Sequence, residues 1–120
     1  MSITKLIRPF LAPRYQKIER YTTRAEEIQM RVLQRLLTAA ANTEWGRRHQ
    51  FQAICTYEQF AASCPVTNYD DLKADIDRMR HGERDVLWPG RVQWYAKSSG
   101  TTSDKSKFIP VSPQGLKDTH

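Results

Sequence analysis

Long apolar stretches are absent from this 120-residue sequence. No run approaches the roughly 18 apolar residues that a membrane-spanning helix needs, so the sequence predicts no membrane partner. Residues 1–16 have a basic start and a few apolar residues, but their apolar run is too short for a secretory signal and is interrupted by Arg8, Pro9 and Pro13. The cytoplasm is therefore the expected location.

Cysteine and histidine are also scarce, with two and three residues respectively. Cys55 and Cys64 lack the spacing of a metal or redox motif, and two reduced thiols are favoured over a disulfide. The histidines are scattered along the chain, without a cysteine or a paired carboxylate at ligand spacing. The sequence therefore predicts no metal site built by protein side chains.

The charge is not balanced, because 19 Lys and Arg residues against 13 Asp and Glu residues give a net charge of +6. The basic residues are dispersed and are not interleaved with aromatic side chains, as they are on surfaces that stack bases. A solvated surface, or one that meets acidic parts of a larger protein, is favoured over nucleic-acid binding. A small basic helical module that binds nucleic acid or a protein without catalysis is kept as an alternative.

Helical patterns dominate the sequence up to Gly82. A capping box at 23–26 precedes apolar residues at helical spacing up to about Asn42, which predicts one long amphipathic helix. Residues 42–51 are expected to form a loop, in which Trp45 and His49 plug a helical core.

Two further helices are expected after this loop. A second capping box at 56–59 predicts a shorter helix that ends before Pro65, because the residue before a proline avoids helical angles. Another helix should begin near Asn68 and end at Gly82. Its early Asp70 and Asp71 suit the positive end of the helix dipole better than an acid–base pair.

The character of the sequence changes after these helices. Residues 86–90 indicate an extended segment that closes in a turn, and 91–96 and 108–111 have the composition of short strands. Ser112 and Pro113 then form the start of a helix. The predicted fold class is α+β, with N-terminal helices followed by a β-hairpin. We expect 1–84 to form a helical segment and 85–120 to form the start of a sheet that is incomplete here.

A loop rich in hydroxyl groups separates the two predicted strands and ends in lysines. Glycine lets the backbone approach a ligand closely, successive amides form an anion-binding concavity, and hydroxyls donate to phosphate oxygens. Lysines add positive point charges. The expected nucleotide-binding residues are Ser98, Ser99, Gly100, Thr101, Thr102, Ser103, Lys105 and Lys107.

This loop is not the phosphate loop of the common NTPases. That motif needs a second glycine where Lys105 stands here. A flexible polar hairpin tip has a similar composition, so composition alone supports phosphate binding and this alternative about equally.

The segments Ser98–Thr102 and Lys105–Pro110 resemble the nucleotide loop of the auxin-responsive acyl-acid-amido synthetases, which belong to the adenylate-forming superfamily. Residues 43–51 and 65–70 are similar to the upstream layout of the same family. The resemblance covers nearly all of the chain and indicates an N-terminal fragment of a member of the bacterial type. It implies that the helices and the hairpin belong to a larger α/β adenylate-forming domain.

The resemblance implies a ligase that converts a small carboxylic acid and ATP to an acyl adenylate and transfers the acyl group to an amine, typically an amino acid. The loop would hold the phosphates of ATP, and Mg²⁺ would arrive with the nucleotide. Asp104 stands where the family frequently has glycine, and it adds a negative charge beside the phosphates.

The expected partners are ATP, the acid, the amine and the remainder of the parent enzyme. Catalytic residues are not identifiable, and we expect this chain alone to be inactive. A coenzyme A ligase with the same type of loop is a further alternative, because only the acceptor step separates the two reactions.

Overall fold

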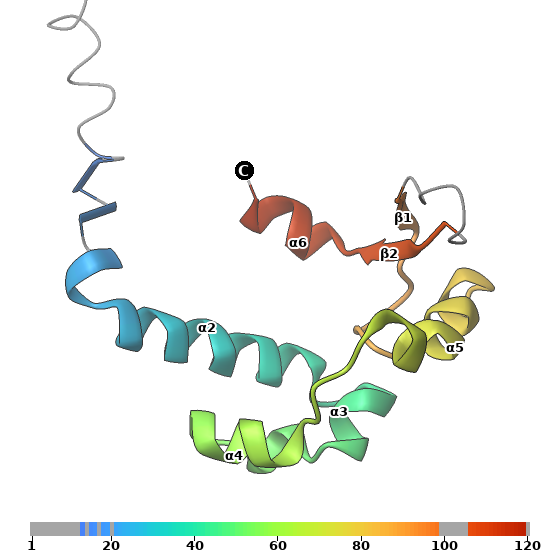
Figure 1. Ribbon diagram of the computed structural model, residues 1–120, viewed down its shortest axis with the longest axis horizontal. Helices are drawn as coiled ribbons and strands as arrows, with labels where there is room; N and C mark the ends of the chain where they lie inside the picture. Colours follow the sequence, from blue (N-terminus) through green and yellow to red (C-terminus); the bar gives the residue numbers. More distant parts are fainter. Residues whose placement is uncertain (1–12, 14, 17, 20, 99–105, 120) are drawn as a thin grey trace, which may run out of the picture. The chain divides into compact units, whose positions relative to one another are not determined.

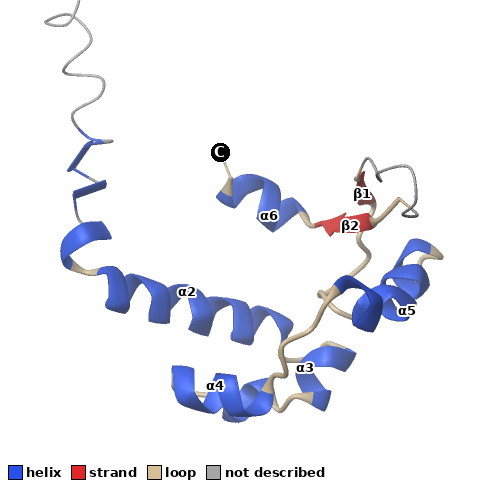
Figure 2. Cartoon of the chain, viewed as in Figure 1, coloured by secondary structure: helices blue, strands red, loops and turns tan. Residues whose placement is uncertain are grey.

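The computed structural model describes residues 13, 15–16, 18–19, 21–98 and 106–119. The chain divides into two compact units, Met1–Gln34 and Arg35–His120. Helices α2 to α6 make up the larger share of the regular secondary structure in the described residues, and an antiparallel pair of strands precedes α6 (Figures 1 and 2). The described part is therefore α+β, as predicted. The predicted division at 84/85 stays a prediction.

Helix α2 (Ala25–Ala40) confirms the long amphipathic helix. It begins at Ala25, where the Ile28 amide donates to the Arg24 carbonyl at 3.0 Å, and this start is within the usual uncertainty of a helix boundary. Towards its end Leu37 and Ala40 are buried. The apolar stripe is thus a packing surface in its last turn.

A short helix forms where we expected a loop. Thr43 is completely buried, and its hydroxyl donates to the Ala40 carbonyl at 2.7 Å and accepts from the Gly46 amide at 2.9 Å. These bonds cap α3 (Glu44–Arg48), so the predicted loop over 42–51 was wrong at its centre. The signal was present in the sequence, because a threonine followed by an acidic residue is typical of a helix start.

A single 3₁₀ turn, η1 (Phe51–Ala53), leads to helix α4 (Tyr57–Ser63). The Thr56 hydroxyl accepts from the Gln59 amide at 3.3 Å, and the Gln59 side chain accepts from the Thr56 amide at 3.2 Å. This is the predicted capping box. The helix ends before Pro65, also as predicted.

Helix α5 (Tyr69–Arg80) begins directly after the predicted Asn68 and ends two residues before Gly82, the predicted stop. The Asn68 side chain accepts from the amides of Asp70 and Asp71 at 2.8 and 3.2 Å, and Asp71 accepts from the Asn68 amide at 2.8 Å. Gly82 follows the helix with φ of +98°, a left-handed conformation that glycine adopts without steric cost.

The main apolar cluster lies between α5 and the segment that follows it. It consists of buried Met79, Val86 and Val92, with Leu87, Trp88 and Tyr95 packed against it. Residues 85–90 form a closed turn, because the Asp85 amide donates to the Gly90 carbonyl at 3.1 Å and the Asp85 carboxylate accepts from the Gly90 amide at 2.6 Å.

The turn also caps α3. Its carbonyls at Asp85 and Val86 accept from the amides of Glu44 and Trp45 at 2.7 and 3.0 Å. Amides in the first turn of a helix have no partner within the helix, so these two bonds satisfy donors that would otherwise be left unpaired. The turn is thereby fixed to α3.

Strands β1 (Trp94–Lys97) and β2 (Phe108–Val111) form an antiparallel hairpin in which Trp94 pairs with Val111 and Lys97 with Phe108. The second strand has the predicted bounds, whereas the first begins later than the predicted 91–96 because Val92 is taken into the apolar cluster. Helix α6 (Pro113–Asp118) follows, and the Ser112 hydroxyl accepts from the Gly115 amide at 3.0 Å, which confirms the predicted cap.

Candidate functional site

The candidate site is the connection between β1 and β2, of which the structure describes the two ends. The Ser98 amide donates to the Lys107 carbonyl at 2.9 Å, and the Ser98 hydroxyl accepts from the Lys107 amide at 3.2 Å. These bonds continue the hairpin by one residue pair beyond Lys97 and Phe108. Ser98 and Lys107 are therefore held opposite each other, where the predicted phosphate loop begins and where it ends.

Most of the predicted nucleotide-binding residues lie outside the described part of the chain. The structure gives no geometry for Ser99, Gly100, Thr101, Thr102, Ser103 and Lys105, nor for Asp104. Their assignment to the phosphates of ATP stays a prediction. Of the predicted set, the structure brings together Ser98 and Lys107.

Helix α5 contacts the hairpin at the residues that follow the loop. The Tyr69 hydroxyl accepts from the Phe108 amide at 3.0 Å, and the Lys107 ammonium lies 5.6 Å from the centre of the Tyr69 ring. The Arg80 guanidinium lies 3.7 Å from the centre of the Phe108 ring. Both ends of α5 thus contact the beginning of β2.

These contacts are absent from our sequence-based site. Tyr69 and Phe108 are 39 positions apart, and no spacing rule connects residues at that separation. Tyr69 was predicted as part of a helix and lies in the segment 65–70 that resembles the family, and neither observation assigned it to the site. Only the tertiary structure reveals that it reaches the hairpin.

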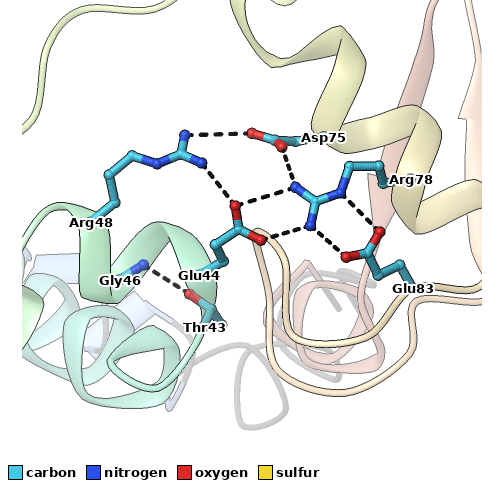
Figure 3. Close-up of polar contacts among 7 residues, drawn as sticks. All are labelled: Thr43, Glu44, Gly46, Arg48, Asp75, Arg78 and Glu83. Carbon is cyan, nitrogen blue, oxygen red and sulfur yellow. Dashed lines mark hydrogen bonds and ion pairs between the residues drawn. The ribbon is translucent and has the colours of Figure 1, made fainter.

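Charged side chains from α3, α5 and the following turn form a second cluster (Figure 3). Arg78 is its centre, with hydrogen bonds to Glu44 at 2.7 and 3.2 Å, to Asp75 at 2.9 Å, and to Glu83. Arg48 approaches from α3, 2.9 Å from Glu44 and 3.8 Å from Asp75. The cluster ties α3 to α5 and to Glu83, which lies between α5 and the turn at 85–90.

The electrostatics of this cluster favour fully charged side chains. Hydrogen bonds from Arg78 hold the pKa of Glu44 and of Glu83 below their usual range. The bonds from Glu83 and Glu44 in turn raise the pKa of Arg78. A carboxylate held in this way is a poor proton donor, so we interpret the cluster as a structural connection of α5 rather than as an acid–base pair.

Trp45 and His49 form a half-buried contact, but they lie in α3 and at its C-terminal cap rather than in the loop that we expected. Their ring centres are 4.2 Å apart, and the His49 Nδ1 atom lies 2.8 Å from the Ser63 carbonyl at the end of α4. The pair therefore joins α3 to α4.

Two features are absent from the described part of the chain. Its His, Cys, Asp and Glu side chains form no group of three or more that could hold a metal ion. Its helices include none with the length and the apolar composition of a membrane span.

Comparisons with known proteins connect this chain to a family. The family model described as GH3 family N-terminal domain matches residues 14–120. Indole-3-acetic acid-amido synthetase GH3.6 of Arabidopsis thaliana is 32% identical over 102 residues, which cover 84% of this chain and 17% of that protein. Indole-3-acetic acid-amido synthetase GH3.17 of the same plant is 34% identical over 101 residues, or 82% of this chain and 17% of that protein.

A rice protein extends the similarity to a second plant. The probable indole-3-acetic acid-amido synthetase GH3.2 of Oryza sativa subsp. japonica is 31% identical over 101 residues, 83% of this chain and 16% of that protein. The chain thus spans 16–17% of the length of these relatives. They are plant proteins and give no support to the predicted bacterial type. The match over residues 14–120 places the chain in the GH3 family, as its N-terminal domain.

Proposed function

We propose that this chain is the N-terminal part of an ATP-dependent ligase that joins a small carboxylic acid to an amine through an acyl adenylate. The observation that carries the proposal is the hydroxyl-rich loop, which ends in Lys107 and occurs in a chain of the GH3 family. The relatives are named as indole-3-acetic acid-amido synthetases, which supports amide formation with an acid as one substrate. A cytoplasmic location, where ATP is available, forms part of the proposal.

In the proposed first step, a carboxylate oxygen attacks the α-phosphorus of ATP and pyrophosphate leaves. In the second step, the amine nitrogen attacks the acyl carbon, loses a proton and displaces AMP. The role of this chain is to hold phosphate oxygens. Ser98 offers a hydroxyl and Lys107 an ammonium at the two ends of the loop, and both suit phosphate oxygens better than a bare metal ion.

The other predicted loop residues take the same role in the proposal. Ser99, Gly100, Thr101, Thr102 and Ser103 would supply amides and hydroxyls, and Lys105 a second cation. Mg²⁺ would reach the site bound to ATP and offset negative charge on the phosphates. The rest of the parent enzyme would bind the acid and the amine.

The test is acid-dependent exchange of labelled pyrophosphate into ATP, with the full-length protein that carries this domain and a panel of acids including indole-3-acetic acid. We expect exchange with at least one acid. Lys107→Ala should lower the rate at low ATP by about 10- to 100-fold, which corresponds to one lost charge-assisted hydrogen bond. Lys117→Ala is the matched control, because Lys117 is an exposed lysine of α6.

Each other outcome has a definite meaning. Exchange that is equal in the Lys107 and Lys117 variants would keep the enzyme class but remove Lys107 from the site. Exchange that is absent with every acid, together with salt-dependent binding of DNA or RNA, would favour the basic binding module instead. A product containing coenzyme A rather than an amide would identify the thioester-forming alternative.

A further inference from the structure

The amide of Phe108 has an acceptor outside the hairpin. Residues paired in an antiparallel sheet alternate between those that exchange backbone hydrogen bonds and those that do not. Ser98 bonds to Lys107 through its amide, and the next pair is Lys97 with Phe108. The Phe108 amide points away from β1, and the Tyr69 hydroxyl accepts from it at 3.0 Å.

The ring of Tyr69 also approaches the side chain of the preceding residue. The Lys107 ammonium lies 5.6 Å from the ring centre, within the range of a cation–π interaction. A single side chain thus contacts both the backbone after Lys107 and the charged end of Lys107. Lysine has a long flexible stem, so two such contacts restrict where its charge can lie.

Tyr69 itself is held firmly at the start of α5. It is the first residue after Asn68, whose side chain caps the helix through the amides of Asp70 and Asp71. At the other end of the same helix, Arg78 is tied to α3, and Arg80 covers the ring of Phe108. Helix α5 is therefore a fixed support for the beginning of β2.

We propose that Tyr69 is a positioning residue for Lys107. Its hydroxyl fixes the backbone at Phe108 and its ring flanks the ammonium, so that Lys107 presents its charge to a phosphate oxygen of the nucleotide in one orientation. The inference rests on the proposed function, because it assigns Tyr69 a role at the same nucleotide site. It predicts that loss of the hydroxyl weakens the use of ATP and leaves the use of the acid unchanged.

The chain offers a matched control for this proposal. Tyr57 is the first residue of α4, as Tyr69 is of α5, and each follows a capping residue. Tyr57 is 62% exposed. Tyr57→Phe and Tyr69→Phe therefore remove the same atom from the same position of two helices, whereas the hydrogen bond to the hairpin belongs to Tyr69.

The experiment measures pyrophosphate exchange by the full-length protein, with ATP and acid varied separately, and ATP affinity by calorimetry. We expect Tyr69→Phe to raise the KM and Kd for ATP about 3- to 10-fold, the loss expected for one hydrogen bond, with an unchanged KM for the acid. The melting temperature should stay within about 3 °C of wild type. Tyr69→Leu, which also removes the ring, should weaken ATP use further, and Tyr57→Phe should behave as wild type.

A double variant separates positioning from general support. If Tyr69 acts through Lys107, Tyr69→Phe should have no further effect on ATP affinity in a Lys107→Ala background, because the two changes remove one function. Equal effects of Tyr69→Phe in both backgrounds would overturn the proposal. A lower melting temperature with an unchanged KM and Kd for ATP would also overturn it, and would make Tyr69 a purely structural contact.

The failure of the proposed function has a different signature. If the wild-type protein binds ATP but exchanges no pyrophosphate, the ligase proposal is wrong. The effect of Tyr69→Phe on the Kd for ATP would then still test the Tyr69 proposal. A wild-type protein that neither exchanges pyrophosphate nor binds ATP would overturn both.

Discussion

Gly46 lies where no side chain fits. A Cβ atom at this position would be 2.0 Å from the Ala40 carbonyl oxygen and 3.0 Å from that of Ala41. Both atoms belong to the backbone and cannot rotate away. Glycine is therefore required here for space, and the chain can turn from α2 into α3 only with a bare backbone at this residue.

We expect Gly46→Ala to lower the free energy of unfolding by roughly 3 kcal/mol, because the end of α2 must move to admit the methyl group. Urea denaturation followed by circular dichroism would measure the change. The matched control is Gly115→Ala in α6, where a Cβ atom would meet only the Ser112 hydroxyl at 3.3 Å. That change should alter stability by less than about 1 kcal/mol, and equal losses in the two variants would contradict the spatial argument.

At the scale of elements, the helix starts were the most predictable features. The box at Thr56, the start of α5 at Asn68 and the cap at Ser112 form as the sequence indicated, because each involves residues within one helical turn. Helix α3 was missed although it has the same kind of signal at Thr43. Its five residues carry too little apolar periodicity to stand out from a loop.

We predict that Asn68→Ala lowers the free energy of unfolding by about 1 kcal/mol, since the amides of Asp70 and Asp71 lose their acceptor. Asn68→Ser, which retains a capping oxygen, should recover most of this loss. Thermal or urea unfolding of the two variants would check the order. If serine costs as much as alanine, the capping oxygen is not what holds the start of α5.

At the scale of the whole molecule, the Arg78 cluster makes stability depend on pH. Glu44 and Glu83 have pKa values below the ordinary 4.5 in the folded state, chiefly because Arg78 donates to them. Since their folded pKa is lower than the unfolded one, they stabilise the fold above the unfolded pKa. This contribution is lost as the pH falls through the folded pKa.

The free energy of unfolding should therefore fall as the pH is lowered from about 5 to 3, and Arg78→Gln should make this fall shallower. Urea titrations at a series of pH values would measure it. Arg31→Gln is the control, because Arg31 pairs with Glu27 on an exposed surface with 73% of its side chain accessible. If the free energy of unfolding falls as steeply with pH in Arg78→Gln as in wild type, groups outside this cluster cause the loss of stability at low pH.

Local sequence signals were sufficient to predict α2, α4, α5, the second strand and the start of α6, because each of these elements depends on neighbours along the chain. Capping residues, glycine stops and apolar periodicity act within a few positions, and the loop motif was sufficient to indicate the family that the comparison then confirmed.

The tertiary structure alone decided how α5 is used. The contacts of Tyr69 with Lys107 and Phe108, and of Arg78 with Glu44, join residues more than 30 positions apart. Such contacts depend on how the elements pack, and packing follows from the burial of Met79, Val86 and Val92 together rather than from any one segment. The sequence therefore predicted which residues form the loop. Only the packing of α5 against the hairpin revealed that Tyr69 contacts the end of this loop at Lys107 and Phe108.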